Sequence, residues 1–399
     1  MTHPSSSPDL RMRPNKSPQR VRFGYPWIFA DELVLDRRSR AVPAGSIVEV
    51  QAHDGERLGL FGFNAESRIA ARLLDRNPDA VIDAGWFAVR LQHALDLRER
   101  LYAEPFYRLI HAEADGLPGL IIDRFGDVAA IQPNAAWAEA RIGDLAAALA
   151  GVTGVTTIIK NGTGRTRALE GLADEALMLA GDLDAPVPVR MNGATYFADL
   201  LHGQKTGLFF DQRDNHAFAA RLAKGGRVLD VFAHVGGFAL AALAAGAVSA
   251  EAVDGSQPAL DLAERGAVAS GFAGEFAAIR GDAFEVMADM AKAGRRFDMV
   301  VCDPPAFAPN RNALEAGLRA YEKVARLGAS LVAPGGFLCV CSCSHAADLA
   351  KFREVSTRGI GKAGRAGPLI HIGSAGPDHP LHPQLAESGY LKALFFRLD

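Results

Sequence analysis

Three of the four cysteines alternate along one predicted strand. Cys339, Cys341 and Cys343 occupy every second position of segment 336–345, so their side chains are expected on one face of that strand. They lack the Cys-x-x-Cys and paired-histidine spacing of zinc sites and the framework of a disulfide-stapled domain, which predicts reduced thiols and no metal. Cys339 and Cys302 are expected to be small apolar core residues. Cys343, the last on the strand, could reach a substrate.

A reactive thiol at a strand end suits one difficult methylation. Carbon 5 of cytosine is a poor nucleophile, but a thiolate that adds to carbon 6 turns carbon 5 into the nucleophilic end of an enamine. Free cysteine is only a few per cent thiolate near pH 7, so such a site must lower the thiol pKa or remove the proton as the base docks. The neighbouring His345 is expected to stabilise the loop.

A carboxyl group and two prolines follow another apolar strand, segment 297–302. In Asp303-Pro304-Pro305-Ala306-Phe307 the prolines enforce a stiff, extended turn that would hold Asp303 at the strand end. The aromatic ring could stack on a base removed from its own stack. The segment therefore predicts Asp303 as a group that binds the base and assists proton transfer. Its expected substrate contacts are Pro304, Pro305 and Phe307.

The segment 228–238 predicts a cofactor turn, because a strand runs into Gly236-Gly237 and then a helix. Asp254 ends the next strand, where it could accept hydrogen bonds from ribose hydroxyls, and Asp282 follows the third, near an adenine amino group. No Gly-x-Gly-x-x-Gly triplet is present to bind a pyrophosphate, which favours S-adenosylmethionine over a nicotinamide cofactor. The expected cofactor residues of these turns are Asp230, Phe232, Ala233, Gly236, Gly237, Asp254, Gly255, Ser256, Asp282, Ala283 and Asp303.

Alternating apolar strands and helices position these groups. From about residue 225 the pattern predicts a parallel sheet covered by helices on both faces, with ligands at the carboxyl ends of the strands. The predicted strands are 227–231, 250–253, 276–279, 298–302 and 337–341. The predicted helices are 238–245, 258–270, 284–292 and 314–332.

The first half of the chain reads as two smaller domains. Residues 1–20 are rich in Pro, Ser and Arg and are expected to be a disordered tail. Residues 21–76 carry short alternating runs typical of a β-rich, barrel-like domain. Residues 77–185 predict an α+β domain with helices at 81–101 and 135–149, a hairpin around 120–131 and a strand at 154–160. The prolines at 186 and 188 mark the start of the last domain, 186–399.

Composition indicates a globular protein of 399 residues in two or three domains, with 49% hydrophobic and 22% charged residues. No apolar run of about 18 residues and no signal-peptide core are present, so a cytoplasmic location and no membrane partner are expected. The net charge is −3, yet the first forty residues hold eight basic and four acidic side chains. Phosphate contact and a solvated surface both fit this skew.

Several segments resemble the bacterial large-subunit ribosomal RNA cytosine-5 methyltransferases that carry an N-terminal PUA domain. The resemblance runs from about Val21 to the C-terminus. The segments that carry it are Gly-Tyr-Pro-Trp-Ile-Phe at 24–29, Glu-Ala-Asp-Gly-Leu-Pro-Gly-Leu at 113–120, the segment 203–215, and Asp-His-Pro-Leu-His-Pro at 378–383 with Tyr-Leu-Lys at 390–392. Two positions depart from the family: His234-Val235 replaces the usual Tyr-Thr, and Ala306 stands where Lys is common.

The resemblance implies a PUA-like RNA-binding domain, a central α+β domain and a Rossmann-like methyltransferase domain with a mostly parallel seven-stranded sheet. It implies S-adenosylmethionine as cofactor, RNA (23S ribosomal RNA) as partner, and Cys343 as nucleophile with Cys341 as the alternative. It also implies that Phe209, Asp211 and Arg213 border the cofactor. Without the resemblance, Asp211 could simply cap a helix that begins at Gln212, and Arg213 could be a surface residue.

The sequence is compatible with other functions. Methylation of a guanine or adenine nitrogen would need the Asp303 turn but no thiol. A non-catalytic RNA-binding or ribosome-assembly factor could keep the cofactor fold, and a nicotinamide oxidoreductase is a more distant reading. The sequence leaves open the target nucleotide, naked RNA against an assembling particle, and the oligomeric state, for which a homodimer is one candidate.

Overall fold

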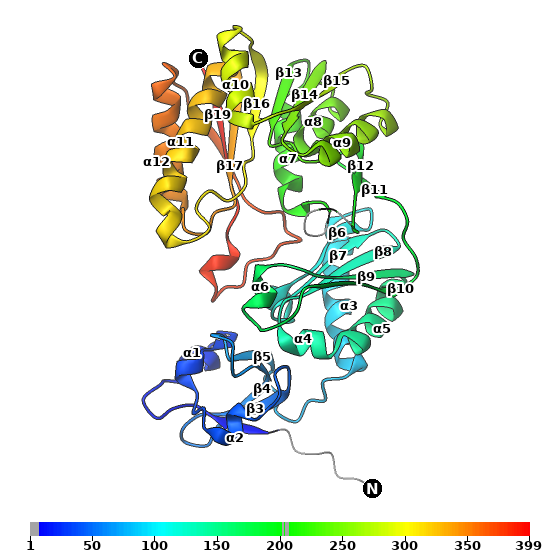
Figure 1. Ribbon diagram of the computed structural model, residues 1–399, viewed down its shortest axis with the longest axis vertical. Coiled ribbons are helices and arrows are strands. Elements are labelled where there is room, and N and C mark those ends of the chain that lie inside the picture. Colours follow the sequence, from blue (N-terminus) through cyan, green and yellow to red (C-terminus); the bar gives the residue numbers. More distant parts are fainter. Residues whose placement is uncertain (1–7, 202, 204–206) are drawn as a thin grey trace. The chain divides into compact units, whose positions relative to one another are not determined.

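A computed structural model describes residues 8–201, 203 and 207–399 (Figure 1). The chain forms two compact units: unit 1 is Met1–Ala185 with Pro380–Ala386, and unit 2 is Pro186–His379 with Glu387–Asp399. The short segment Pro380–Ala386 therefore departs from the single last domain expected from the sequence. Within unit 1, Leu385 is buried and the Gln384 side chain donates a hydrogen bond to the carbonyl of Phe23 at 3.2 Å.

The first half of unit 1 is a five-stranded sheet in the order β1-β3-β4-β5-β2. Its strands are β1 (Asp9–Arg11), β2 (Trp27–Ile28), β3 (Ile47–Gln51), β4 (Arg57–Phe63) and β5 (Ala71–Asp75). Two short helices accompany it, α1 (Gln19–Arg22) and α2 (Arg37–Arg40).

The prediction of a disordered tail over residues 1–20 is wrong for the residues that the structure describes. β1 pairs in parallel with β3, and Leu10 and Met12 are buried in the sheet's core. A three-residue strand is too short to show apolar periodicity, and long-range pairing with β3 supplies what the local sequence lacks. The remaining part of that prediction, residues 1–7, lies outside the described residues.

The second half of unit 1 is a five-stranded sheet, β10-β9-β8-β7-β6, packed against helices. The strands are β6 (Phe106–His111), β7 (Leu120–Phe125), β8 (Val128–Pro133), β9 (Thr157–Gly162) and β10 (Glu175–Ala180). The helices are α3 (Ala84–Leu101), α4 (Ala136–Ala140), α5 (Ile142–Thr153) and α6 (Arg165–Ala168). The single helix expected at 135–149 is two helices, because the chain leaves helical geometry at Arg141 (φ −114°, ψ 17°).

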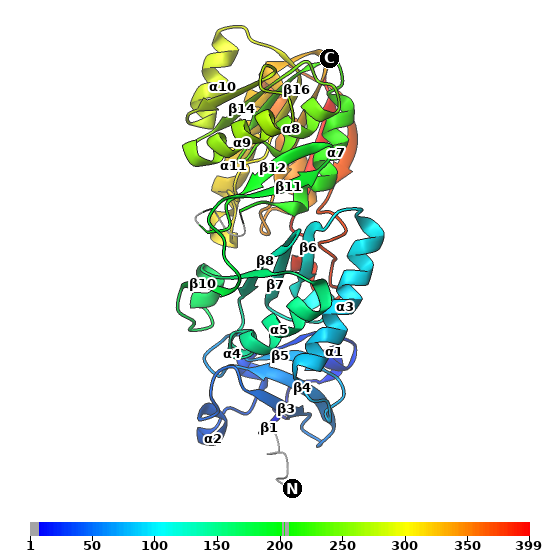
Figure 2. The ribbon, with the colours of Figure 1, turned by 90° about the vertical axis from the view of Figure 1, so that its right-hand side faces the viewer.

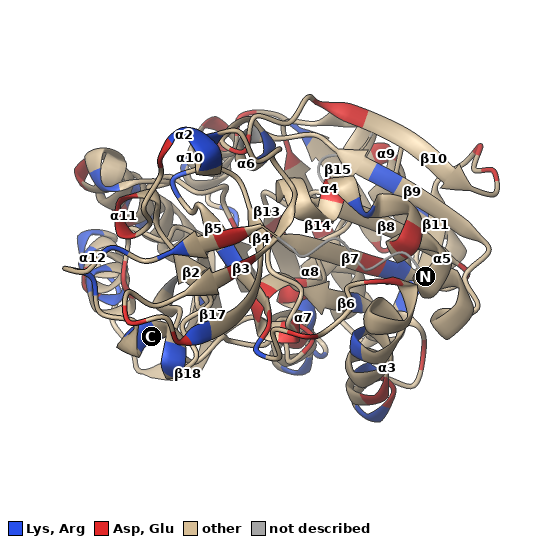
Figure 3. Ribbon diagram, turned by 90° about the horizontal axis from the view of Figure 1, so that it is seen from below, with Lys and Arg blue, Asp and Glu red and all other residues tan. Residues whose placement is uncertain are grey.

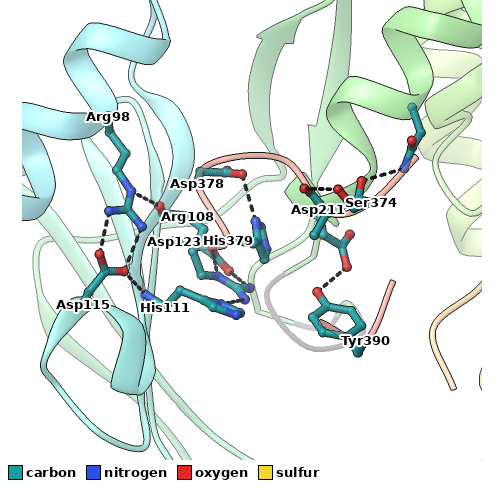
Figure 4. Close-up of polar contacts among 12 residues, drawn as sticks. Arg98, Arg108, His111, Asp115, Asp123, Asp211, Ser374, Asp378, His379 and Tyr390 are labelled. Atoms are coloured by element: carbon teal, nitrogen blue, oxygen red, sulfur yellow. Dashed lines mark hydrogen bonds and ion pairs between the residues drawn. The ribbon is translucent and has the colours of Figure 1, made fainter. Parts of the chain in front are cut away.

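Buried ion pairs join the elements of unit 1. Arg98 of α3 is fully buried and donates to both carboxylate oxygens of Asp115, at 2.7 and 2.8 Å (Figure 4). Glu170 accepts hydrogen bonds from Arg72 at 2.9 Å and from Ser67 at 2.6 Å. Both donors belong to the first half of unit 1. Such bidentate and multiply bonded pairs fix geometry because every buried charge has to keep a partner.

Unit 2 is built on a seven-stranded sheet in the order β15-β14-β13-β16-β17-β19-β18. The first five strands are parallel, whereas β19 runs antiparallel to both β17 and β18. The strands are β13 (Arg227–Val231), β14 (Ser249–Asp254), β15 (Phe276–Arg280), β16 (Phe297–Cys302), β17 (Val332–Ser342), β18 (Leu369–Gly373) and β19 (Lys392–Arg397). The predicted fold class of this domain is confirmed.

Helices cover both faces of this sheet (Figures 1 and 2). One face packs against α7 (Arg213–Leu222), α8 (Gly237–Ala244) and α9 (Gln257–Ala269). The other packs against α10 (Ala283–Lys292), α11 (Leu314–Leu331) and α12 (Leu349–Lys362). A separate hairpin, β11 (Val187–Met191) and β12 (Ala194–Ala198), lies against α8 and α9. The carboxyl ends of the parallel strands consequently meet at one edge.

Basic and acidic residues are interspersed along the chain, and on α3 residues of both signs alternate (Figure 3). No helix among the described residues is long and apolar enough to cross a membrane. Across the same residues, no group of three or more His, Cys, Asp or Glu side chains could hold a metal ion.

Candidate active site

Two adjacent parallel strands bring the predicted catalytic residues to the same edge of the sheet. β16 pairs with β17 so that Cys302 lies opposite Val340. Asp303 directly follows β16, and Cys343 directly follows β17. Parallel neighbours end at the same edge, so the carboxyl group and the thiol occupy neighbouring loops there.

Burial separates Cys343 from the other three cysteines. Cys302, Cys339 and Cys341 are fully buried, whereas Cys343 is partly exposed. The sulfur atoms of Cys339 and Cys341 lie 3.6 Å apart in the core beneath α7 and α8, and Cys302 lies on the opposite face. Burial raises the pKa of Cys341 well above its ordinary value, which argues against it as a nucleophile. β17 ends at Ser342, so Cys343 lies in the following loop, and only Cys339 and Cys341 of the three predicted positions alternate on the strand.

A buried hydroxyl network ties the two loops together. Ser344 Oγ accepts a hydrogen bond from the backbone N–H of Ala308 at 2.9 Å and lies 2.7 Å from the hydroxyl of Tyr321. The Tyr321 hydroxyl also accepts from the N–H of Phe307 at 3.4 Å. Ser344 and Tyr321 are almost completely buried. The loop after β16 and the loop after β17 are therefore held in one arrangement by α11.

The environment of Asp303 raises its pKa to about 8, because protein atoms displace water from the carboxyl group and the Asp211 carboxylate repels its charge. The side-chain amide of Gln212 acts in the opposite direction. Gln212 is buried, and its Oε1 accepts a hydrogen bond from Asn215 Nδ2 at 2.7 Å, which fixes the orientation of the amide. Asp303 can thus hold or release a proton near neutral pH.

Asp230 is the penultimate residue of β13 and is buried beneath the first turn of α8. Its Oδ2 accepts a hydrogen bond from the N–H of Ala239 at 2.9 Å, while Oδ1 is buried without a hydrogen-bond partner among the described residues. Burial raises the pKa of Asp230 to about 7, and the Asp254 carboxylate adds to this shift. An unsatisfied buried acceptor at a strand end leaves room for a donor from a ligand.

Asp254 fixes the turn that follows β13. Its two oxygens accept hydrogen bonds from the N–H of His234 at 2.9 Å and of Ser256 at 2.8 Å. Within the turn, Phe232 (φ 63°) and His234 (φ 50°) adopt the left-handed region, which side-chain-bearing residues rarely occupy. The ring of Phe209 lies 5.1 Å from that of His234. Such strained backbone persists where the surroundings enforce it, commonly at functional sites.

The two glycines of the turn are required for different structural reasons. Gly236 adopts φ 80° at the N-terminus of α8, a conformation that favours glycine. A Cβ atom on Gly237 would lie 2.6 Å from Cε1 of His216, so this glycine makes room for a buried histidine of α7. The sequence predicts Gly237 as a cofactor residue of this turn, and the structure adds that its missing side chain accommodates the imidazole of His216.

Asp211 contacts the C-terminal segment instead of capping a helix. Its Oδ2 accepts a hydrogen bond from the hydroxyl of Tyr390 at 2.6 Å (Figure 4). α7 begins at Arg213, and no side chain caps it, so the capping interpretation of Asp211 does not hold. Arg213 itself is partly exposed at the start of that helix.

The remaining predicted residues divide between capping, packing and exposure. Asp282 is exposed and caps α10 by accepting from the N–H groups of Phe284 and Glu285, and Ala283 is buried. Gly255 and Pro305 are exposed, whereas Ala233 and Pro304 are buried. The ring of Phe307 packs among those of Phe232, Phe284 and Tyr321, with centroid distances of 6.4, 6.1 and 5.0 Å.

Sequence reasoning missed several residues that shape this site. They are Gln212, His216, Tyr321, Ser344 and Lys392. Gln212 lies between Asp211 and Arg213, so its position in a distinctive segment was a usable signal. Lys392 likewise lies in the distinctive segment 390–392, whereas His216, Tyr321 and Ser344 come from α7, α11 and the loop after β17, which no local pattern connects.

The acidic groups at this edge fit a cationic nucleoside cofactor. The Asp211 and Asp230 carboxylates both raise the pKa of Asp303, and the Asp254 carboxylate raises that of Asp230. S-adenosylmethionine carries a sulfonium and an ammonium group, whose positive charges would offset this repulsion. The unsatisfied Oδ1 of Asp230 supplies an acceptor for such a donor.

Two family models match the chain. Residues 146–397 match a family described as S-adenosylmethionine-dependent methyltransferase, and residues 10–76 match a PUA-like domain. The expected methyltransferase and PUA-like domains are confirmed.

Relatives of similar length share about a third of the sequence. One from Shewanella denitrificans, named ribosomal RNA large subunit methyltransferase I, is 35% identical over 98% of this chain and 99% of its own. A second with the same name, from Aeromonas salmonicida, is 33% identical over 94% of this chain and 95% of its own.

Solved structures share the fold. One is described as a SAM-dependent methyltransferase from Streptococcus mutans; it aligns with a TM-score of 0.80 at 18% identity, covering 98% of this chain and 100% of its own. Another, described as a methyltransferase complexed with SAH, aligns with the same TM-score and identity over 98% and 99% of the two chains.

Proposed function

The chain belongs to the ribosomal RNA large subunit methyltransferase I family of S-adenosylmethionine-dependent methyltransferases, and on that premise we propose that it methylates carbon 5 of a cytosine in large-subunit ribosomal RNA. One observation carries the choice of carbon 5. The partly exposed thiol of Cys343 and the carboxyl group of Asp303 directly follow adjacent parallel strands, and the Asp211 and Asp230 carboxylates act on Asp303. Methylation of a base nitrogen would have no use for such a thiol.

S-adenosylmethionine supplies a methyl group activated by the sulfonium charge. Asp254 suits its ribose hydroxyls, and the unsatisfied oxygen of Asp230 suits its ammonium group. Phe209, beside the ring of His234, offers an apolar surface at the same turn. The further residues proposed to border the cofactor are Asp211, Arg213, Phe232, Ala233, Gly236, Gly237, Gly255, Ser256, Asp282, Ala283 and Asp303.

Cys343 is the proposed nucleophile. Its thiolate adds to carbon 6 of the cytosine, forming a sulfur–carbon bond while the carbon 5–carbon 6 double-bond electrons move toward carbon 5 and the ring. Carbon 5 then accepts the methyl group, and loss of its proton restores the double bond as the sulfur–carbon bond breaks. The thiol's partial exposure and its place in a loop fixed by Ser344 support this role.

Asp303 is the proposed acid–base group. A carboxyl group with a pKa of about 8 exists in both protonation states near neutral pH. Its protonated form can hydrogen-bond the base, and its ionised form can accept the proton from carbon 5. Pro304, Pro305 and Phe307, in the same turn, are proposed to contact the base, and the prolines restrict the turn's movement.

The PUA-like domain supports RNA as the substrate class. Arg20 is exposed, and its guanidinium group lies 3.8 Å from the ring centroid of Tyr25. Phe23, which lies between them in the sequence, is 73% exposed. Exposed arginines and aromatic rings together suit phosphate contact and base stacking in single-stranded or looped RNA.

The test is methyl transfer in vitro by the full-length protein to ribosomal RNA from a strain lacking the gene. Labelled S-adenosylmethionine and nucleoside mass spectrometry would report the product, expected to be 5-methylcytidine. RNA containing 5-fluorocytidine should trap a covalent adduct, because fluorine at carbon 5 cannot leave as a proton does.

Matched cysteine variants separate the alternatives. Cys343→Ser should lose both turnover and adduct while still binding S-adenosylmethionine in a thermal-shift assay, whereas Cys341→Ser should keep both. A methylated guanine or adenine nitrogen, or an active Cys343→Ser variant, would overturn the thiol mechanism. Absence of any methyl transfer to under-methylated RNA would favour a non-catalytic RNA-binding factor.

A further inference from the structure

A buried lysine lies beside the loop that carries Cys343. Lys392, the first residue of β19, pairs with Ser342 of β17 and is only 8% exposed. Its ammonium group donates hydrogen bonds to the backbone carbonyls of Ser344 at 2.7 Å and Ala347 at 2.8 Å. Both acceptors belong to the loop after β17. The lysine thus holds this loop from the neighbouring antiparallel strand.

The ammonium group of Lys392 forms no ion pair with a carboxylate among the described residues. Burying a charge without a counter-ion is costly, and carbonyl dipoles offset only part of that cost. Burial lowers the pKa of Lys392, while Cys343 and Asp348 act to raise it. Because the ammonium group bonds the carbonyl of Ser344, the residue after Cys343, a thiolate at position 343 would stabilise the positive charge of Lys392, and the attraction would be reciprocal.

Other titratable groups also face this loop. α11 contributes Tyr321, the N-terminus of α12 contributes Asp348, and the loop itself contributes His345, whose ring centroid lies 5.7 Å from that of Tyr390. Tyr321 and Asp348 are neutral or negative near pH 7, so neither favours a thiolate. His345 is exposed to solvent, which weakens any charge it acquires. Lys392 remains the buried cation of this set.

We propose that Lys392 is a positioning residue for methyl transfer, whose buried ammonium group fixes the loop after β17 and favours the ionised form of Cys343. The inference rests on the proposed role of Cys343 as nucleophile. No bond to Lys392 forms or breaks: the thiol releases its proton to solvent, and the lysine keeps its own. The two carbonyl bonds use two of the three N–H donors of the ammonium group, and they hold its charge in the loop.

The experiment measures the ionisation of Cys343 without RNA or cofactor. The full-length protein is alkylated with iodoacetamide across a pH series, and mass spectrometry follows the peptide containing Cys343. Alkylation needs the thiolate, so its rate reports the thiol's pKa. Lys392→Gln removes the charge but keeps a side-chain N–H donor, and Lys392→Arg keeps the charge. Lys362→Met, which changes an exposed lysine of α12, is the matched control.

Lys392→Gln should react about tenfold more slowly at pH 7, with its alkylation midpoint moved to higher pH by about one unit. Lys392→Arg and Lys362→Met should behave like the wild type. Equal alkylation profiles for Lys392→Gln and the wild type, with both proteins folded by circular dichroism, would overturn the proposal. A slow Lys392→Arg variant would also overturn it, because it would show that shape and not charge matters.

Turnover distinguishes this inference from the proposed function. The kcat of Lys392→Gln should fall and its pH profile should move to higher pH, while the KM for S-adenosylmethionine stays unchanged. If Cys343→Ser remained active although alkylation still depended on Lys392, the thiol mechanism would fail and the lysine–thiolate coupling would stand.

Discussion

Replacing Asp303 by asparagine is expected to stabilise the protein in alkaline solution while abolishing its proposed acid–base role. The site raises the pKa of this carboxyl group from its ordinary value of 3.8 to about 8. Between those values the folded chain retains a proton that the unfolded chain releases, so the stability contributed by this group falls as pH rises. Above about pH 8 the carboxyl group is ionised in both states, and the loss is complete.

The size of the effect follows from this window. Each pH unit below the pKa of about 8 corresponds to about 1.4 kcal/mol, so the roughly 2.5 units from about pH 5.5 to about pH 8 account for at most about 3.5 kcal/mol. Water reaches the partly exposed Asp303, so we expect about 1–2 kcal/mol. For a unit of this size that is a difference of about 3–6 °C in unfolding midpoint.

Differential scanning calorimetry of the wild type and Asp303→Asn at several pH values measures this effect. The midpoint of the variant should exceed that of the wild type increasingly from about pH 5.5 to about pH 8.5. Asp289→Asn, at an exposed carboxylate of α10, is the control and should leave the difference unchanged with pH. Tryptophan fluorescence identifies which calorimetric transition belongs to unit 1, because that unit contains Trp27, Trp86 and Trp137. Parallel midpoint curves for the wild type and Asp303→Asn would refute the reasoning.

Three further predictions concern packing around the site and within unit 1. Ser344→Ala leaves the N–H of Ala308 and the hydroxyl of Tyr321 without their shared partner, and should lower the free energy of unfolding by about 1–3 kcal/mol in urea titrations; an unchanged midpoint would contradict it. Gly237→Ala places a Cβ against His216 and should lower the unfolding temperature, and adding His216→Ala should recover part of the loss; additive losses in this double-mutant cycle would refute the packing argument. Glu170→Gln leaves the guanidinium group of Arg72 buried without a counter-ion at this position and should cost about 2–4 kcal/mol, measured by tryptophan fluorescence in urea; a cost below about 0.5 kcal/mol would show that the pair is dispensable.

The regular succession of apolar strands and amphipathic helices made most of unit 2 predictable. The strands expected at 227–231 and 298–302 appear as β13 (Arg227–Val231) and β16 (Phe297–Cys302), because a strand buried on both faces must be continuously apolar. The short parallel strand β1 gave no such signal, since its pairing with β3 is made at long range. The sequence also did not predict that Pro380–Ala386 belongs to unit 1, because no local pattern in that segment indicates which residues it packs against.

The chemistry-bearing side chains were visible in the sequence, but their environments were not. Asp303 and Cys343 stand out because each directly follows an apolar strand. The pKa of about 8 for Asp303 depends on Asp211, nearly a hundred positions earlier, and on burial. Likewise, the position of Gly237 in the turn after a strand predicts a cofactor residue, whereas only the structure shows that a side chain there would collide with the imidazole of His216.

By itself, the sequence determined the doubly wound sheet, the order of its turns and the residue types that those turns present, because strand and helix periodicity are local properties of the chain. Only the tertiary structure decided which thiol is accessible and which carboxyl groups repel one another. It also decided that Lys392, at the start of β19, lies against the loop of Cys343. Burial and electrostatic interaction depend on distances in space, and these arise from pairing between strands far apart in the chain.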